Sequence, residues 1–482
     1  MRTRILASLL LAFPILVAGC DDRIIFRERQ LLENLPAQAG GYVGLSDTTT
    51  NLTVCGNCHV THQNQWEETA HATAFADATA AAPQIADLCA SCHAVSEVGN
   101  SNEAAGGWPA TRDRRYQSVQ CESCHGPGEA HVRNPNDATA TAMLASINAG
   151  PDMNGTCAEC HSGAHHPYVE EWEVSGHGTA VASAAARTEC QGCHEGKAAM
   201  AAMGALGEYK EKGTTGVLPI TCTVCHDPHR ADNAKQLRYS INVPNEEENL
   251  CMRCHHKRGG PELTGNRGPH SPEGPMLLGE AGWWPPTMQI DTNTLILSTH
   301  GSERNPRMCA GCHMQQINAT DKVTNQIVIP TTGHLFEAIP CLDTTGQPTR
   351  SDACTIDQRT FRTCATGGCH ATEQDARTAM LRVRTRIDGW NVQLKGQLAR
   401  VPAGEINPSD NRYTTAEGAT FNSQLADRSG SVVHNPFLLE ALLIASIQQI
   451  QREYGIAPRM TTPDLTTELQ RVLKAAQLKG AE

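Results

Sequence analysis

The most regular alternation of hydrophobic and polar positions lies in the last quarter of the chain. Apolar residues recur at helical spacing across 373–399, a stretch rich in helix-forming residues. Asn435 and Pro436 supply a cap and a first turn for a second helix over 437–454, and a third helix is expected over 463–478. The pattern therefore predicts that the chain ends in a helical region.

A second hydrophobic run lies at the start of the chain and is too short to cross a membrane comfortably. Residues 5–17 are apolar and follow two arginines, which is typical of a signal peptide. The run ends in Val-Ala-Gly-Cys20, which resembles the bacterial lipobox and implies that Cys20 is acylated as the first residue of the mature chain. The alternative is an ordinary signal peptide with an incidental cysteine. The signal peptide predicts export into an oxidising compartment. Because no later segment is apolar enough to span a bilayer, we expect the mature protein to be held at the membrane by a lipid anchor.

Elsewhere we expect short helices, turns and little sheet. Only 4% of the 482 residues are aromatic and 39% are hydrophobic, which is little material for a conventional core of this size. The formal net charge of -12 argues against a nucleic-acid partner. Something other than side chains must supply buried apolar bulk, and the matching counts of 21 cysteines and 21 histidines direct attention to a cofactor.

A short motif, Cys-x-x-Cys-His, occurs eight times in the sequence. The copies are Cys55/Cys58/His59, Cys89/Cys92/His93, Cys121/Cys124/His125, Cys157/Cys160/His161, Cys190/Cys193/His194, Cys222/Cys225/His226, Cys251/Cys254/His255 and Cys309/Cys312/His313. This is the attachment pattern of c-type haem, in which two thiols add to the vinyl groups of one porphyrin and the adjacent histidine becomes the proximal iron ligand. Zinc sites and redox dithiols share Cys-x-x-Cys, but neither explains why a histidine follows every pair.

A ninth candidate motif, Cys364/Cys369/His370, has four residues between its cysteines. We interpret it as a haem site in which two glycines let the longer loop fold back, while the alternative is a disulfide followed by a chance histidine. Cys341 and Cys354 are not followed by histidine, so a structural disulfide is their expected use.

The first seven motifs begin 29 to 36 residues apart, which predicts an array in which each unit contacts its neighbours. Motifs one and four are each followed by a Trp and a His five residues apart, and motifs three and six by a Pro and then another His. These matches predict a duplicated three-haem module, although haem motifs resemble one another in any case. The expected organisation is a signal peptide (1–19), a tether (20–54), module A (55–150), module B (151–245), motifs seven to nine with long loops (246–370) and a C-terminal helical region (371–482).

The nine motifs, the sequences CHGPGEAH (124–131) and CHDPH (225–229), and the His-Asn-Pro start of a C-terminal helix resemble the large multihaem cytochromes of metal-respiring and related anaerobic bacteria. The resemblance covers about residues 51–455. It implies a mainly α fold with extensive irregular loops, wrapped around closely stacked haems and closed by a C-terminal helical cap. The cofactor is haem c, bound covalently and about nine in number.

The resemblance also implies distal iron ligands among the twelve histidines outside the motifs, enough for every iron to bind two imidazoles. An iron with two axial imidazoles has no open position for a substrate, so it suits electron transfer. Eight candidates stand in family-like segments: His71, His131, His177, His229, His270, His300, His334 and His434. His62 is our candidate for the ninth place, in competition with His165, His166 and His256, and the helix that begins at His434 is expected to pack over motif nine.

The leading functional hypothesis is electron transfer from membrane or periplasmic donors to a periplasmic or extracellular acceptor, without catalytic residues. Expected partners are other redox proteins or quinol-oxidising complexes, with an outer-membrane porin–cytochrome conduit as a further candidate. The protein would be lipid-anchored at the periplasmic face, the outer membrane or the cell surface. The alternatives are a multihaem reductase of a small nitrogen or sulfur oxyanion at one open haem, and a subunit of an extracellular cytochrome filament.

Overall fold

The computed structural model describes residues 39–44, 54–81, 86–100, 102, 105–136, 143–148, 156–163, 167–262, 267–288, 295–316, 318–320, 327–330, 332–342, 348–349, 354–366, 368–457 and 465–480. The α-helices are α1 (Val60–Trp66), α2 (Ala70–Ala81), α3 (Ala86–His93), α4 (Gly107–Thr111), α5 (Cys121–His125), α6 (Glu129–Arg133), α7 (Tyr168–Val174), α8 (Ala182–Ala185), α9 (Thr188–His194), α10 (Gly196–Ala202), α11 (Cys222–Cys225), α12 (Glu273–Leu278), α13 (Ala310–His313), α14 (Arg362–Thr366), α15 (Glu373–Leu398), α16 (Thr415–Ala426), α17 (Ser431–His434), α18 (Pro436–Tyr454) and α19 (Leu465–Gly480). Short 3-10 helices are η1 (Cys55–Asn57), η3 (Arg114–Tyr116), η4 (Ala234–Gln236), η5 (Pro286–Met288), η6 (Thr299–Gly301) and η7 (Ile356–Gln358).

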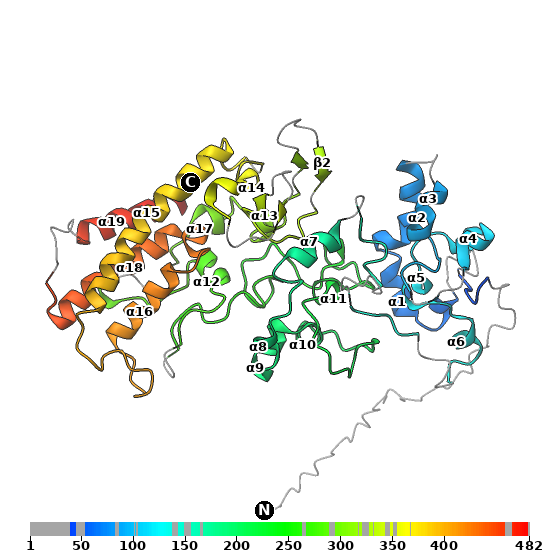
Figure 1. Ribbon diagram of the computed structural model, residues 1–482, viewed down its shortest axis with the longest axis horizontal. Helices are drawn as coiled ribbons and strands as arrows, with labels where there is room; N and C mark the ends of the chain where they lie inside the picture. The colour runs from blue at the N-terminus through cyan, green and yellow to red at the C-terminus, as the bar shows by residue number, and fades with distance from the viewer. Residues whose placement is uncertain are drawn as a thin grey trace, which may run out of the picture.

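The molecule is mainly helical with extensive irregular loops, and it is elongated (Figure 1). The chain advances along the long axis, with α1–α6 at one end, α7–α11 in the middle and the long C-terminal helices at the other end. Within the described residues, strands form only two antiparallel pairs, β1 (Asn318–Thr320) with β2 (Ile327–Pro330) and β3 (Cys341–Leu342) with β4 (Pro348–Thr349). The expectation of short helices and little sheet before residue 371 is confirmed.

The three helices expected at the C-terminal end are confirmed as α15, α18 and α19. They enclose the largest apolar cluster of the described chain, in which Ile387, Leu394 and Leu442 are fully buried. Helix α16 completes this cluster and was not expected from the sequence. Conventional side-chain packing is therefore concentrated at one end of the molecule.

Helix α18 begins as the sequence predicted. The side chain of Asn435 accepts a hydrogen bond from Leu438 N at 3.0 Å, which caps the helix, and Pro436 occupies the first turn, where no backbone donor is needed. Asn435 is fully buried and also donates to the carbonyl of Ile296 at 2.6 Å. The cap therefore fixes the helix to the segment that precedes motif eight.

Among the described residues, no helix combines the length and the apolar character that a membrane crossing requires. Cys20 and the expected signal peptide lie outside the described residues.

Candidate cofactor-binding cavity

One continuous cavity of about 4780 Å³ runs through the molecule, and the histidine of every one of the nine motifs lines it. Shared among nine motifs, this volume is about 530 Å³ each, within the range of about 300–1,000 Å³ in which proteins usually hold one small-molecule ligand. Its lining combines apolar surface with the motif thiols and imidazoles. The cavity therefore has the size and the chemistry for a series of porphyrins rather than for one substrate.

Several motifs share a compact turn that is closed by a backbone hydrogen bond. In motifs one, four, six, seven and eight, the histidine N–H donates to the carbonyl of the first cysteine at 2.8–3.0 Å. In the longer ninth motif, His370 N donates to Cys364 O at 3.2 Å, so the same bond closes a larger turn. Gly368 in this turn has φ +73°, which favours glycine. The extra residues are accommodated without losing the geometry of the shorter motifs.

Backbone carbonyls orient several of the motif imidazoles. The Nδ1 atoms of His93, His125, His226 and His313 lie 2.6–3.0 Å from the carbonyl oxygens of Ala74, Met143, Lys235 and Phe336, respectively. A carbonyl can only accept, so Nδ1 carries the proton and Nε2 keeps the lone pair that a metal requires. These four rings are therefore held in the form in which a haem iron binds histidine.

Eight of the nine motif histidines face a second histidine at nearly constant distance. A metal–imidazole bond is about 2 Å long, so two imidazoles on opposite sides of one metal have ring centroids roughly 6 Å apart. The centroid distances are 6.4 Å for His59–His131, 6.1 Å for His125–His229, 6.2 Å for His161–His71, 6.0 Å for His194–His270, 6.3 Å for His226–His334, 6.1 Å for His255–His177, 6.2 Å for His313–His434 and 6.5 Å for His370–His300. Each pair is spaced to hold one iron.

The pairs do not respect the expected module boundaries. His71, from module A, faces motif four in module B, and His229, from module B, faces motif three in module A. Both predicted modules therefore need side chains from the other.

Two ligand assignments differ from expectation. His434 does not lie over motif nine: its ring pairs with His313 of motif eight, and His300 takes the place beside motif nine. That expectation was wrong because sequence distance does not indicate which motif a loop reaches.

His62, the candidate for the ninth place, lies elsewhere. Its ring centroid is 5.1 Å from that of His229 and 6.2 Å from that of His59, both of which belong to pairs already formed. Its competitor His256 has Nδ1 beside the carbonyl of Met252, and His165 and His166 lie outside the described residues.

Burial favours the uncharged form of five of the eight second histidines. It lowers the pKa of His177, His334 and His434 to about 4, and it also lowers the pKa of His71 and His270. Because only neutral imidazole has a lone pair for a metal, these side chains are ready to bind iron at neutral pH.

His255 in motif seven behaves differently. Its Nδ1 lies 3.4 Å from Oε2 of Glu273 as an ion pair, and this neighbouring carboxylate raises the pKa of His255. Burial acts to raise the pKa of Glu273, but the neighbouring imidazole of His255 holds that pKa below the ordinary value. The pair is therefore a carboxylate beside an imidazole.

Thiols of different motifs also meet. In five pairs of cysteines, the two thiols lie close enough for one to shift the pKa of the other: Cys55–Cys121, Cys92–Cys160, Cys157–Cys222, Cys193–Cys254 and Cys251–Cys309. These contacts link motif one to three, two to four, four to six, five to seven and seven to eight. The first two recur three motifs later as the third and fourth, the same interval as in the predicted three-motif repeat. Cysteines of neighbouring motifs therefore lie close together.

The Trp–His pairs repeat in structure as well as in sequence. Trp66 Nε1 donates to Val119 O at 2.9 Å, and Trp172 Nε1 donates to Ile220 O at 2.8 Å. Val119 N and Ile220 N in turn donate to the carbonyls of the following histidines, His71 and His177, at 3.1 Å. Each tryptophan therefore fixes a predicted distal histidine beside the segment that leads into motif three or motif six.

The segment 332–342 contacts motifs six and eight. Its anchor is Glu171 of α7, whose carboxylate accepts from Thr332 N, Thr332 Oγ1 and His334 N at 2.6–2.8 Å. His334 faces motif six, while the carbonyl of Phe336 accepts from His313 in motif eight. Sequence reasoning missed Glu171, and no sequence signal marks it.

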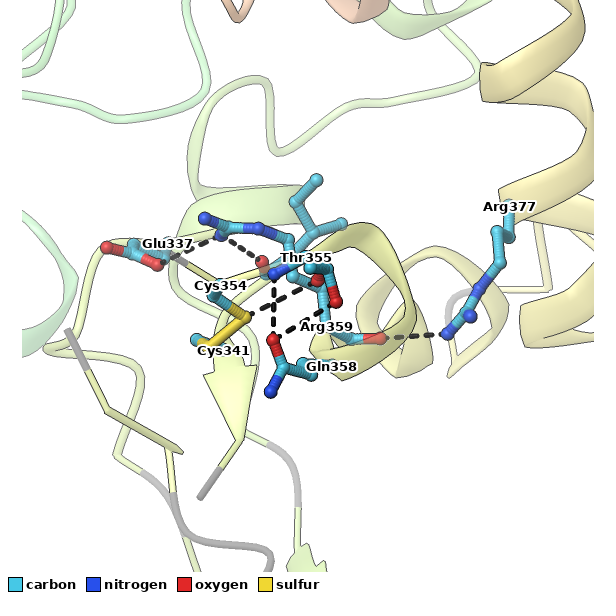
Figure 2. Close-up of a disulfide and its surroundings, with 8 residues drawn as sticks. Glu337, Cys341, Cys354, Thr355, Gln358, Arg359 and Arg377 are labelled. Carbon is cyan, nitrogen blue, oxygen red and sulfur yellow. Dashed lines mark hydrogen bonds and ion pairs between the residues drawn. A yellow bond between two sulfur atoms is a disulfide. The ribbon is translucent and has the colours of Figure 1, made fainter. Parts of the chain in front are cut away.

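The same segment ends in a disulfide between Cys341 and Cys354, with Cα atoms 6.0 Å apart (Figure 2). Arg359 donates to the carbonyl of Ile339 at 3.0 Å, and Arg377 of α15 donates to the carbonyl of Arg359 at 2.9 Å. These bonds attach segment 332–342 to Arg359, which precedes motif nine, and through it to α15, which follows the motif.

Comparison with known proteins gives two family matches and several relatives. The model for a doubled CXXCH motif matches residues 219–260, and the model for cytochrome c554 and c-prime matches residues 54–126. The multiheme cytochrome MtrA of Shewanella baltica (strain OS185) is 26% identical over 254 residues, which cover 50% of this chain and 69% of the relative. Among solved structures, the outer cell wall cytochrome OcwA has a TM-score of 0.45 at 20% identity, covering 75% of this chain and 76% of its own. An undecaheme cytochrome from the S-layer of Carboxydothermus ferrireducens has a TM-score of 0.45 at 22% identity, covering 70% of this chain and 50% of its own.

The cavity and its motifs are those of a haem protein. With the two family matches and the relative that spans half of the chain, they identify this protein as a multihaem c-type cytochrome that carries covalently bound haem c.

Proposed function

We propose that the protein binds nine haems c, one at each motif, and transfers electrons along them. The observation that carries this proposal is the set of eight histidine pairs with ring centroids 6.0–6.5 Å apart. Haem c supplies a one-electron couple between ferric and ferrous iron. With imidazoles on both sides, these irons have no position for a substrate, which favours electron transfer over catalysis.

The order of the motifs follows from the thiol contacts and from neighbouring thiols whose charges interact. The latter link motif three to four, six to seven and eight to nine. A main line then runs through motifs one, three, four, six, seven, eight and nine, with motif two beside four and motif five beside seven. The chain's part is to hold these sites in contact and to exclude water from them.

We further propose an exported protein with an acyl group on Cys20 and redox proteins as donor and acceptor. The predicted lipobox supports the first point. The second is supported by the relationship to a multiheme cytochrome and by the position of motifs one and nine at opposite ends of the main line. The segment 20–54 would be the tether, and the C-terminal helices would cover motif eight through His434.

Intact mass and spectroscopy of the purified protein test this proposal. The mass should show nine haems per chain, and the ferric protein should give a low-spin electron paramagnetic resonance signal. Carbon monoxide should bind to no more than a minor fraction of the reduced protein. Stoichiometric carbon monoxide binding, or a high-spin signal equivalent to one or more haems at the eight paired sites, would contradict an electron-transfer role and favour a reductase.

A further inference from the structure

Motif seven differs from its neighbours in the group that faces the outer nitrogen of its histidine. Four other motif histidines direct Nδ1 to a neutral backbone carbonyl. In motif seven, Oε2 of Glu273 lies 3.4 Å from Nδ1 of His255 as an ion pair, and this buried oxygen makes no hydrogen bond within the described residues. A full negative charge therefore replaces a carbonyl dipole.

The backbone fixes this contact. Glu273 is the first residue of α12, and Gly274 N donates to the carbonyl of His255 itself at 2.8 Å. A Cβ atom at Gly274 would lie 3.0 Å from that carbonyl oxygen, so the close approach requires a small residue. The start of α12 is therefore attached to motif seven, and the carboxylate has little freedom to leave the imidazole.

We propose that Glu273 lowers the reduction potential of the haem at motif seven below the potentials of the haems whose proximal histidines face carbonyls. This inference rests on the ligation proposed above. A carboxylate that accepts the Nδ1 proton makes the imidazole a stronger donor to the metal. Both the stronger donor and the nearby negative charge stabilise ferric iron more than ferrous iron, because ferric iron carries the larger positive charge.

Because motif seven lies between other motifs, a lower reduction potential at its haem would affect electron transfer along the whole series of motifs. Cys254 contacts Cys193 of motif five, and Cys251 contacts Cys309 of motif eight. The charge of Glu273 also acts on His270, beside motif five, and on His434, beside motif eight. A low-potential site at this junction would separate electrons held on motifs one to six from those held on motifs eight and nine.

The test is a redox titration of the intact holoprotein carrying Glu273→Gln, monitored by its visible absorption. Glutamine retains an acceptor but removes the charge. One haem equivalent of the amplitude should move to more positive potential, with smaller positive shifts for at most two others. The low-spin ferric resonance of that haem should also move, because the donor strength of its imidazole changes. Glu280→Gln is the matched control, since it removes one exposed carboxylate just after the same helix.

A titration curve of Glu273→Gln that superimposes on that of the unchanged protein, or that shifts equally in Glu280→Gln, would overturn the proposal. Glu273→Asp is the second variant, because it keeps the charge but withdraws it from Nδ1; it should shift the same component by a smaller amount. If Glu273→Gln does not assemble with all its haems, absence of a shift in Glu273→Asp rejects the proposal. Failure of the ligation scheme is recognised separately, as high-spin iron in the unchanged protein.

Discussion

At the scale of single residues, the side chains outside the motifs that act on the cofactor are those that hold imidazoles in place. They do so by two routes. Some groups lie directly beside Nδ1, as the backbone carbonyl of Phe336 does for His313 and the carboxylate of Glu273 does for His255. Other side chains fix the backbone that carries the imidazole, as Glu171 does for His334. The second route is invisible in sequence, because it joins residues that lie 163 positions apart.

We predict that Glu171→Gln loosens the ligand beside motif six. A glutamine offers one oxygen acceptor in place of two carboxylate oxygens, so at least one of three bonds to segment 332–342 is lost. Leaving such a buried donor unpaired costs about 1–3 kcal/mol. The reduced variant should therefore bind more carbon monoxide per chain than the reduced unchanged protein does, with an increase of at most one haem equivalent.

The control for this variant is Glu170→Gln on the same helix. The exposed Glu170 bonds the backbone of Gly163 and makes no hydrogen bond to segment 332–342 within the described residues. It should leave carbon monoxide binding unchanged. Equal behaviour of the two variants would show that Glu171 does not position His334.

We also predict matched effects for the two repeated tryptophans. Trp66→Phe and Trp172→Phe keep an aromatic ring but remove the indole N–H that bonds Val119 or Ile220. Each should lower the free energy of unfolding by about 1 kcal/mol, measured by chemical denaturation followed by circular dichroism. If only one variant is destabilised, the two three-motif units are not equivalent in their energetics.

At the scale of elements, conventional helix packing is concentrated at the C-terminal end, and there the sequence was informative. The apolar positions of α15 recur at helical spacing, and the Asn-Pro start of α18 is visible in the sequence. Helix α16 was missed because its small and polar residues carry a weak apolar pattern. Its capping box, Thr414 with Glu417, was the signal available. Gly418 in this helix admits Trp283, whose ring atoms would lie 2.2 Å from an added Cβ.

We predict that Asn435→Ala destabilises the C-terminal helices. The variant loses the cap of α18 and leaves the carbonyl of Ile296 without this donor in a buried site. Losing an N-cap costs about 1 kcal/mol, and an unsatisfied buried acceptor adds about 1–3 kcal/mol. Denaturant unfolding followed by circular dichroism should show a total loss of about 2–4 kcal/mol.

Gln374→Ala, at an exposed position of α15, is the comparison for this variant and should change stability by less than about 0.5 kcal/mol. Because Asn435 follows His434, Asn435→Ala should also weaken ligation at motif eight. A loss of stability no larger than that of Gln374→Ala would mean that the cap does not hold α18 in place.

At the scale of the whole molecule, the sequence predicted features that depend on short spacings, but it did not predict contacts between residues far apart in the chain. The nine motifs and the three-motif repeat depend on short spacings, and the structure repeats the same thiol contacts three motifs apart. The partners of the eight paired motif histidines lie up to 121 residues away in the sequence, as for His434 and His313. Such pairing is decided by how loops pack across the cavity, so sequence could propose candidates but not assign them.

The last prediction follows from the branched order of the motifs. Motif five contacts motif seven from the side, whereas motif six lies between motifs four and seven on the main line. Replacing Cys190 and Cys193 with Ala should remove one haem and leave transfer from end to end intact. Replacing Cys222 and Cys225 with Ala also removes one haem but should interrupt it.

The two double variants are matched controls for each other, because each loses two cysteines and one cofactor. Conductance through single molecules held at their two ends, after mass measurement confirms eight haems in each variant, separates the outcomes. Because an interrupted main line leaves no short alternative between motifs four and seven, only the Cys222/Cys225 variant should lose most of its conductance. Equal losses would mean that the motifs form a network with parallel routes, and a loss confined to the Cys190/Cys193 variant would place motif five on the main line.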